Sequence, residues 1–168
     1  LADAPRVIMP ESGQGAIGPA IAPLGQVYAD YRTHPTFLRK LEIFLEALLG
    51  RRITYELPRI WCTKGETLAA HVKNCPGDAT AWQGTVSCWQ QNRHAGVNHR
   101  RRQCGICAAC LLRRMSVHPA SLTQPNDTYV WEDLSAPTLE AGAWPDFDRA
   151  KITGKMREYA IAGTLHLD

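Results

Sequence analysis

Apolar residues repeat with a helical period in the stretch that follows Thr33. They stand three or four positions apart, a spacing that gathers them on one side of a helix. These residues are Phe37, Leu38, Leu41, Phe44, Leu45, Leu48 and Leu49. Thr33 is placed to cap this helix, Pro35 falls in its first turn, and Gly50 supplies a stop. We predict a helix between Thr33 and Gly50 that lies mostly in the core. His34 suits capping or packing, with a ligand contact as the alternative.

Two short apolar runs, over residues 6–9 and 52–57, predict strands. The second run alternates β-branched and aromatic residues, as strands do. A helix is predicted over residues 64–73, because Thr63 and Glu66 have the spacing of a capping box. Strands that alternate with helices are typical of an α/β fold.

A Gly-rich stretch at residues 11–18 follows the first strand, and we predict that it is a loop. Such a loop can bring backbone amides close to a ligand, although a flexible turn is the alternative. Lys64 would lie in the first turn of the predicted 64–73 helix, near the usual ligand site of an open α/β sheet. It is our candidate catalytic residue, with a solvated lysine as the alternative. The candidate substrate-binding residues are Glu11, Ser12, Gly13 and Gly15.

The rest of the chain has fewer periodic segments. It is turn-rich from Asn74 and loop-like from Pro119, and a last helix is predicted over residues 152–167, with a possible division at Gly163. The opening leucine and the uncapped end at Asp168 suggest a fragment of a longer protein. The expected division is an α/β portion at 1–73, a zinc knuckle at 74–118 and a C-terminal loop and helical extension at 119–168.

Four of the six cysteines have the spacing of metal ligands. Cys104, Cys107 and Cys110 form C-x2-C-x2-C, and Cys88 precedes them by one loop. Four thiolates can close a tetrahedral shell around zinc, and Gly105 permits the tight turn that this shell needs. Because such a shell has no open position, we predict a structural zinc.

Other interpretations of the cysteines stay open. An iron–sulfur cluster is the main alternative, and free thiols or disulfides are the others. Cys62 and Cys75 are expected to be ordinary buried cysteines. His94 and His99 are possible substitute ligands, with a solvated or polar-contact role favoured for both.

Charge is distributed unevenly along the chain. The net charge is only +3, yet residues 87–114 contain no acid and residues 126–148 contain no base. Guanidinium groups match phosphate geometry, so the basic stretch is a candidate site for nucleic acid or a nucleotide triphosphate. The alternative is a solvated face, or one paired with the acidic stretch. The candidate residues are Arg100, Arg101, Arg102, Arg113 and Arg114, with Arg93 in the same stretch.

Composition limits the class of protein. The 168 residues fit one domain, or one domain with an appendage, and 45% hydrophobic with 21% charged residues is ordinary for a globular chain. Apolar segments are interrupted well before the roughly 20 residues of a membrane span, and no signal peptide is visible. Three cysteines in one short run favour a metal in a reducing compartment. We therefore expect a cytoplasmic protein without a membrane partner.

Taken in chain order, the motifs resemble the C-terminal half of the 7-cyano-7-deazaguanine synthase family, over roughly residues 6–115 with a weaker echo at 159–168. More narrowly they resemble the synthase-like component of bacterial Qat anti-phage defence systems. The motifs are Glu-Ser-Gly after the first strand, Arg-Thr-His-Pro at 32–35, Thr-Lys-Gly-Glu at 63–66, Ser-Cys at 87–88, Gln-Cys-Gly-x-Cys-x-x-Cys at 103–110 and Arg-Arg at 113–114.

The resemblance implies an adenine-nucleotide α-hydrolase-like (Rossmann-like) fold and a structural zinc on the four cysteines. It also implies ATP-dependent adenylation of 7-carboxy-7-deazaguanine, attack by ammonia, and conversion of the amide to a nitrile for queuosine or DNA modification. The family's Ser-Gly-Gly-x-Asp-Ser pyrophosphate loop does not occur in these residues. We therefore expect the ATP site to come from an N-terminal half or a partner subunit, with defence-system subunits as possible partners. The alternative is that the scaffold has been reused as a non-catalytic, zinc-stabilised module that binds nucleic acid or protein. The loop between Cys88 and Cys104 is longer than in the housekeeping synthases.

Overall fold

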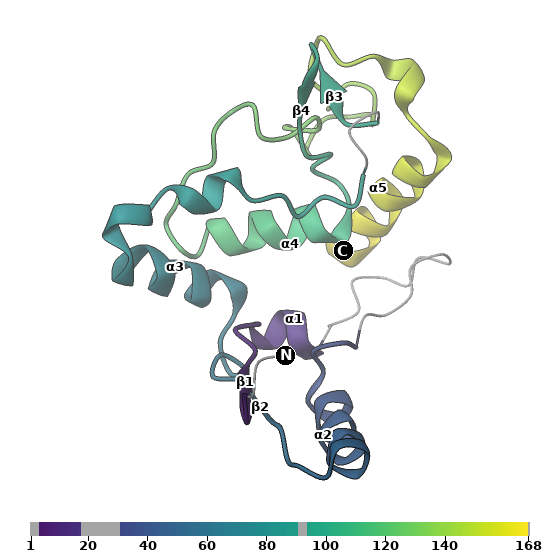
Figure 1. The fold of residues 1–168 in the computed structure, drawn as a ribbon. Coiled ribbons are helices and arrows are strands. Elements are labelled where there is room, and N and C mark those ends of the chain that lie inside the picture. The colour runs from purple at the N-terminus through teal and green to yellow at the C-terminus, as the bar shows by residue number, and fades with distance from the viewer. Residues whose placement is uncertain (1–3, 18–30, 91–93, 168) are drawn as a thin grey trace.

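The elements fall into two groups joined through one helix (Figure 1). The computed structural model describes residues 4–17, 31–90 and 94–167. The first group consists of β1 (Arg6–Ile8), α1 (Gly13–Ile17), α2 (Pro35–Leu49) and β2 (Thr54–Glu56), and α3 (Lys64–Asn74) follows it. The second consists of the 3-10 helices η1 (Pro76–Asp78) and η2 (Ala81–Gly84), β3 (Gly96–Val97), β4 (Arg100–Arg101), α4 (Ala108–Val117), η3 (Arg149–Lys151) and α5 (Gly154–Leu167).

The first group contains a two-stranded parallel sheet. Val7 in β1 is opposite Tyr55 in β2, and the Met9 amide continues the ladder by donating to the Glu56 carbonyl at 2.8 Å. Both predicted strands are present: β1 begins at Arg6 as predicted and ends one residue earlier, and β2 is shorter at both ends. Parallel strands joined through helices confirm the mixed α/β character of the chain.

The Gly-rich stretch is a helix, not the loop we predicted. The Gly13 amide donates to the Cys62 carbonyl at 3.0 Å, and the Ala16 amide donates to the Ser12 carbonyl at 2.8 Å. A side chain at position 13 would collide with the Ile60 carbonyl, so glycine permits this approach. Gly18, the last residue of the predicted loop, lies outside the described residues.

The α2 helix begins one residue later than we predicted. Its N-cap is His34, whose Nδ1 accepts a hydrogen bond from the Thr36 amide at 3.2 Å, so the assignment of Thr33 as the cap was wrong. The imidazole provides the acceptor that a hydroxyl usually provides. At the other end Gly50 adopts φ of 66° and its amide donates to the Glu46 carbonyl, which confirms the predicted stop.

Most of α2 is exposed, which contradicts the prediction that it lies in the core. Leu38 and Glu42 are its buried residues, whereas Phe44 is 58% exposed and Leu48 is 64% exposed. Glu42 accepts hydrogen bonds from the Tyr55 amide at 2.7 Å and from Arg39 at 2.8 Å. Periodicity shows that a helix is amphipathic, but it does not show what covers the apolar face.

The α3 helix carries the capping box predicted from the sequence. The Thr63 hydroxyl accepts from the Glu66 amide at 3.1 Å, and the Glu66 carboxylate accepts from the Thr63 amide at 2.7 Å. These bonds lower the pKa of Glu66, because they favour the charged carboxylate. The Gln14 side chain accepts from the Lys64 amide at 2.8 Å, so α1 satisfies a further free donor at the start of α3.

The core of the second group is built from two parts of the chain, residues 95–110 around the cysteines and residues 129–159 of the C-terminal segment. The Val130 amide donates to the Gln103 carbonyl at 2.8 Å, and the Trp131 amide donates to the Cys104 carbonyl at 3.0 Å. The segment after Pro119 is largely loop, as predicted, yet it forms part of the core. The buried residues of this cluster are Ala95, Val97, Cys104, Ile106, Cys107, Cys110, Tyr129, Val130, Trp131, Ala143, Phe147, Met156 and Tyr159.

Two helices flank this core. We did not predict α4, which starts directly after Cys107. The last helix is present, but it begins at Gly154 and continues through Gly163 without the predicted division. A side-chain carbon at 163 would lie 3.2 Å from Leu111, so glycine lets α5 approach α4. Over the described ranges, no helix combines the length and apolar character needed to cross a membrane.

Candidate metal centre and adjoining cavity

Four cysteine side chains meet in the core of the second group. Cys88 comes from the segment before β3, Cys104 and Cys107 from the turn before α4, and Cys110 from the first turn of that helix. Their sulfur atoms all lie within 4.8 Å of one another. Three of the thiols are fully buried and the Cys88 thiol is half-buried. The predicted cluster is confirmed.

The sulfur positions fit a tetrahedral metal. A zinc–sulfur bond of about 2.3 Å places the four sulfur atoms of a regular tetrahedron about 3.8 Å apart. Cys104 Sγ and Cys110 Sγ are 3.9 Å apart. The four residues are therefore positioned to bind one metal ion, and four thiolates would fill its shell without an open position for substrate.

Hydrogen bonds to sulfur prepare this cluster for the ionised state. Cys88 Sγ accepts from the Cys104 amide at 3.1 Å and from the Gln90 amide at 3.3 Å. Hydrogen bonds from the thiols of Cys104, Cys107 and Cys110 lower the pKa of Cys88, and that of Cys110 is raised because the neighbouring thiols and burial disfavour a second thiolate. A bound cation would remove this conflict by attracting all four thiolates.

Gly105 makes the tight turn between the first two buried ligands possible. Its φ is +91°, a region that residues with a side chain rarely adopt. A side-chain carbon there would also lie 2.6 Å from the Trp131 carbonyl oxygen. Both the backbone conformation and the packing therefore require glycine, as the sequence predicted for this turn.

The other candidate ligands stay outside this cluster. Cys62 is half-buried and Cys75 is exposed, so the expectation that both are buried was wrong. His99 is exposed in the turn between β3 and β4, and neither it nor His94 belongs to the group found among the described residues.

A cavity of about 580 Å³ lies between α3, α4 and the segment 10–12 that precedes α1. Lys64 lines it and forms an ion pair with Glu11, with 2.6 Å between Nζ and Oε1. Ser12 lines it from α1's N-terminal side, and His71 and Arg113 line it from α3 and α4. The side chains of Lys64 and Arg113, set against the one carboxylate of Glu11, give this cavity a positive balance of charge that suits an anionic ligand.

One family comparison identifies the chain. The model of the queuosine biosynthesis protein QueC family matches residues 24–120, more than half of the chain. The chain belongs to the QueC family. No curated protein and no solved structure matches it significantly.

The QueC match includes the four metal-binding cysteines and the whole of α3. It ends before Tyr129 and Trp131, which pack against the cysteines and complete the core. The resemblance identified in the sequence is thereby confirmed for the family. The match does not decide the narrower resemblance to a defence-system component.

The residues that we assigned to the QueC substrate site separate into two sets. Glu11 and Ser12 line the 580 Å³ cavity with Lys64, but Gly13 and Gly15 do not. Gly15 instead leaves room for the Glu11 side chain, because a side-chain carbon at position 15 would lie 2.0 Å from Glu11 Oε1. We did not predict His71 as a lining residue, although its position seven residues after Lys64 places both side chains on one helix face.

Three of the candidate phosphate-binding arginines of this QueC chain contact backbone carbonyls or aromatic rings of the chain itself. Arg113 is buried and donates to the Thr85 and Trp82 carbonyls, each at 3.0 Å. Arg114 donates to the Trp131 carbonyl and lies over the Tyr129 ring, with 3.8 Å to its centroid. Arg102 lies 4.0 Å from the Trp144 ring centroid. These contacts give all three a packing role, and Arg93 lies outside the described residues.

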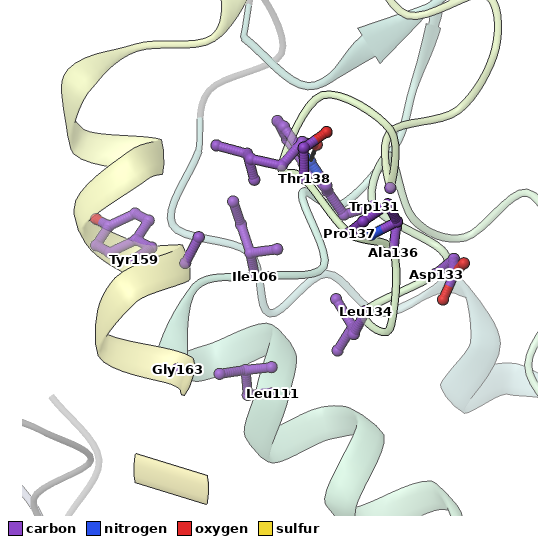
Figure 2. A pocket seen from close by; sticks show the side chains of 13 residues that line it. Ile106, Leu111, Trp131, Asp133, Leu134, Ala136, Pro137, Thr138, Tyr159 and Gly163 are labelled. Atoms are coloured by element: carbon purple, nitrogen blue, oxygen red, sulfur yellow. Dashed lines mark hydrogen bonds between the residues drawn. The ribbon is translucent and has the colours of Figure 1, made fainter. Parts of the chain in front are cut away.

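A second cavity, of about 360 Å³, lies between α5 and the segment after Trp131 (Figure 2). Ile106 and Leu111 form one side of it, and Tyr159 of α5 and Leu134 line it as well. Burial raises the pKa of Tyr159 to about 12, so its hydroxyl stays neutral at physiological pH. This cavity is mostly apolar and lies beside the metal-binding core, apart from Lys64.

Proposed function

We propose that this chain is the zinc-bearing C-terminal part of a 7-cyano-7-deazaguanine synthase-like enzyme. The observation that carries the proposal is the QueC match across both the cysteine cluster and α3. The reaction would convert a deazapurine carboxylate into a nitrile in three stages: adenylation by ATP, attack by ammonia on the adenylate, and dehydration of the resulting amide. A Rossmann-like layer would supply the scaffold, which the parallel pairing of β1 with β2 supports.

We assign zinc to Cys88, Cys104, Cys107 and Cys110, because four thiolates in tetrahedral positions suit zinc best. The ion would join the segment before β3 to the start of α4, and thereby hold the wall of the 580 Å³ cavity that α4 provides. With four protein ligands it would stabilise the fold and take no part in the reaction.

Lys64 is our candidate for contact with the reacting groups. Its ammonium group lies in the cavity and can donate to a carboxylate or phosphate oxygen of the acyl adenylate, where negative charge develops during the reaction. Glu11 forms an ion pair with this group, and Ser12 adds a hydroxyl to the same wall. An anionic substrate would compete with Glu11 for Lys64.

ATP would require residues beyond these elements. The pyrophosphate loop of the family does not occur in this sequence, so an N-terminal half or a partner subunit would supply it. A place in an anti-phage system, with other defence subunits as partners, is the narrower version of this proposal. The free thiols of the described residues support a cytoplasmic location.

The test measures nitrile formation by the complete protein with ATP, 7-carboxy-7-deazaguanine and ammonia. We expect Lys64→Ala to reduce turnover by about 100-fold or more, the size seen when one electrostatic donor to a transition state is lost. Lys73→Ala is the matched control, because this exposed lysine lies on the same helix outside the cavity. Undiminished turnover in Lys64→Ala would remove Lys64 from the mechanism, and absence of product from the native protein would refute the proposed reaction.

A further inference from the structure

The two strands of the parallel sheet differ at their outer edges. Hydrogen bonds between parallel strands use alternate residues of each strand. The Pro5 carbonyl accepts from β2 at 3.0 Å and the Met9 amide donates to β2 at 2.8 Å, so residues 5, 7 and 9 face β2. The backbone groups of Arg6 and Ile8 therefore point away from β2, and over the described ranges they have no hydrogen-bond partner. The outer edge of β1 is free.

The outer edge of β2 is closed by a side chain of α2. Tyr55 is the central residue of β2, and its amide donates to Glu42 Oε1 at 2.7 Å. Glu42 is buried and also accepts from Arg39 at 2.8 Å, so its carboxylate occupies the position where another strand would pair. A buried charge at an edge is one of the ways in which proteins prevent a sheet from extending. The sheet can therefore gain a strand beside β1 and not beside β2.

Two parallel strands make an incomplete layer. Parallel strands occur in sheets whose two faces are covered, and most sheets have about four to six strands. Here the face of β1 that carries Ile8 is open, because this side chain is 55% exposed. Phe37, Phe44 and Leu48 are exposed on α2 at intervals of seven and four residues, which place them on one helix face. Such an exposed apolar surface is typical of one that another part of a protein covers.

The position of the free edge relative to the 580 Å³ cavity indicates which strand belongs there. Residues 10–12 follow β1 and line this cavity together with Lys64. Ligands of open parallel sheets bind outside the carboxyl ends of the strands. A parallel neighbour of β1 would lie about 4.8 Å away and end at the same side of the sheet, so the loop after it would reach the cavity. A loop that binds phosphate groups suits this positively charged position.

We propose that a strand of the ATP-binding N-terminal half pairs in parallel with the free edge of β1. The backbone amides of Arg6 and Ile8 donate to this strand, and their carbonyls accept from it. The strand is the one that leads into the phosphate-binding loop, and it brings that loop to the cavity in which Lys64 and Arg113 supply positive charge. The choice of partner rests on the proposed function, whereas the free edge of β1 does not depend on it.

Amide hydrogen exchange tests the pairing. The exchange rate of the Ile8 amide is measured by mass spectrometry with single-residue fragmentation, in this chain alone and in the complete protein. In the complete protein we expect exchange at Ile8 to be slower by about 100-fold or more, because exchange then requires the new strand to separate from β1. The Tyr55 amide is the internal control, since Glu42 accepts from it within this chain and it should be protected in both.

Two variants at one position separate the backbone hydrogen bond from the side chain. Ile8→Pro removes the amide that points to the free edge, and Ile8→Val keeps it. In this chain alone the two variants should melt at the same temperature, because proline is tolerated on an edge strand that has no partner on that side. In the complete protein Ile8→Pro should melt lower than Ile8→Val by roughly 2 °C or more, since one hydrogen bond of the sheet is lost.

The possible outcomes distinguish the pairing from the proposed reaction. Equal exchange at Ile8 in this chain and in the complete protein would overturn the pairing, and so would equal melting of the two variants in the complete protein. Protection that appears only after a separately encoded subunit is added would overturn the choice of the N-terminal half. Protection at Ile8 without nitrile formation would support the pairing and refute the proposed reaction, whereas nitrile formation with an unprotected Ile8 amide would do the reverse.

Discussion

Loss of one metal ligand should unfold the second group of elements. Cys107 is fully buried, begins α4 as its N-cap, and has Tyr129 and Trp131 in the same core. In the variant Cys107→Ser a hydroxyl replaces the thiolate, and the shell becomes incomplete. Structural zinc contributes on the order of 10 kcal/mol or more to the folding of small domains. Whole domains are stable by about 5–15 kcal/mol, so the loss of most of this contribution is enough to unfold the region.

The assay combines metal analysis by inductively coupled plasma mass spectrometry with thermal unfolding followed by circular dichroism. The native chain should contain about one zinc, and Cys107→Ser should lose both the zinc and the unfolding transition of this region. Cys75→Ser is the control, because that thiol is exposed and stands apart from the cluster, so its zinc content and melting temperature should be unchanged. A Cys107→Ser protein that melts like the native chain would refute the reasoning. Detection of iron and acid-labile sulfide in the native chain would show that the four cysteines hold an iron–sulfur cluster and not zinc.

Three further outcomes follow from particular contacts. Gly105→Ala should lower the free energy of unfolding, measured by urea titration, by at least about 1–2 kcal/mol, roughly the cost of a left-handed residue. Gly77→Ala is the control, because a side-chain carbon there would meet open space and should not lower the free energy of unfolding. Arg113→Ala should destabilise by about 3 kcal/mol, because it leaves the Thr85 and Trp82 carbonyls without their charged donor. The Tyr55 amide lowers the pKa of Glu42 by hydrogen bonding, so the stability that Glu42 contributes is present above pH 4.5 and disappears as pH falls through its lowered pKa. Urea titrations of Glu42→Ala and the native chain should therefore differ at pH 7 and converge in acid, and a constant difference would contradict this assignment.

Local signals predicted the local structure well. The capping box that starts α3 and the glycine that ends α2 act through hydrogen bonds to near neighbours, so they can be read from adjacent positions. The cysteine spacing predicted the metal-binding group for a similar reason. Three of its four members are close in the sequence: Cys104 and Cys107 lie in the turn before α4, and Cys110 lies in the first turn of α4. The sequence also indicated the family, and the match over residues 24–120 confirmed it.

Where the sequence prediction failed, distant contacts decided the outcome. The 11–18 stretch is helical from Gly13 to Ile17 because the Cys62 carbonyl accepts from the Gly13 amide and glycine permits close approach to the Ile60 carbonyl; both partners lie far along the chain. The cap at His34 is an exception, because it depends on a local bond: His34 Nδ1 accepts from the Thr36 amide two residues away. The core position predicted for α2 was wrong because amphipathicity does not specify a covering partner.

The sequence by itself determined which residues can serve as ligands and charges, since thiols, guanidinium groups and glycines are defined by residue type. Tertiary structure alone decided which of them are available. It placed Glu11 against Lys64 across 53 positions. It also separated Arg113 and Arg114, which contact internal carbonyls and rings, from the exposed Arg100 and Arg101 of β4. The physical reason is that a side chain's partners depend on distances between segments that no local pattern records.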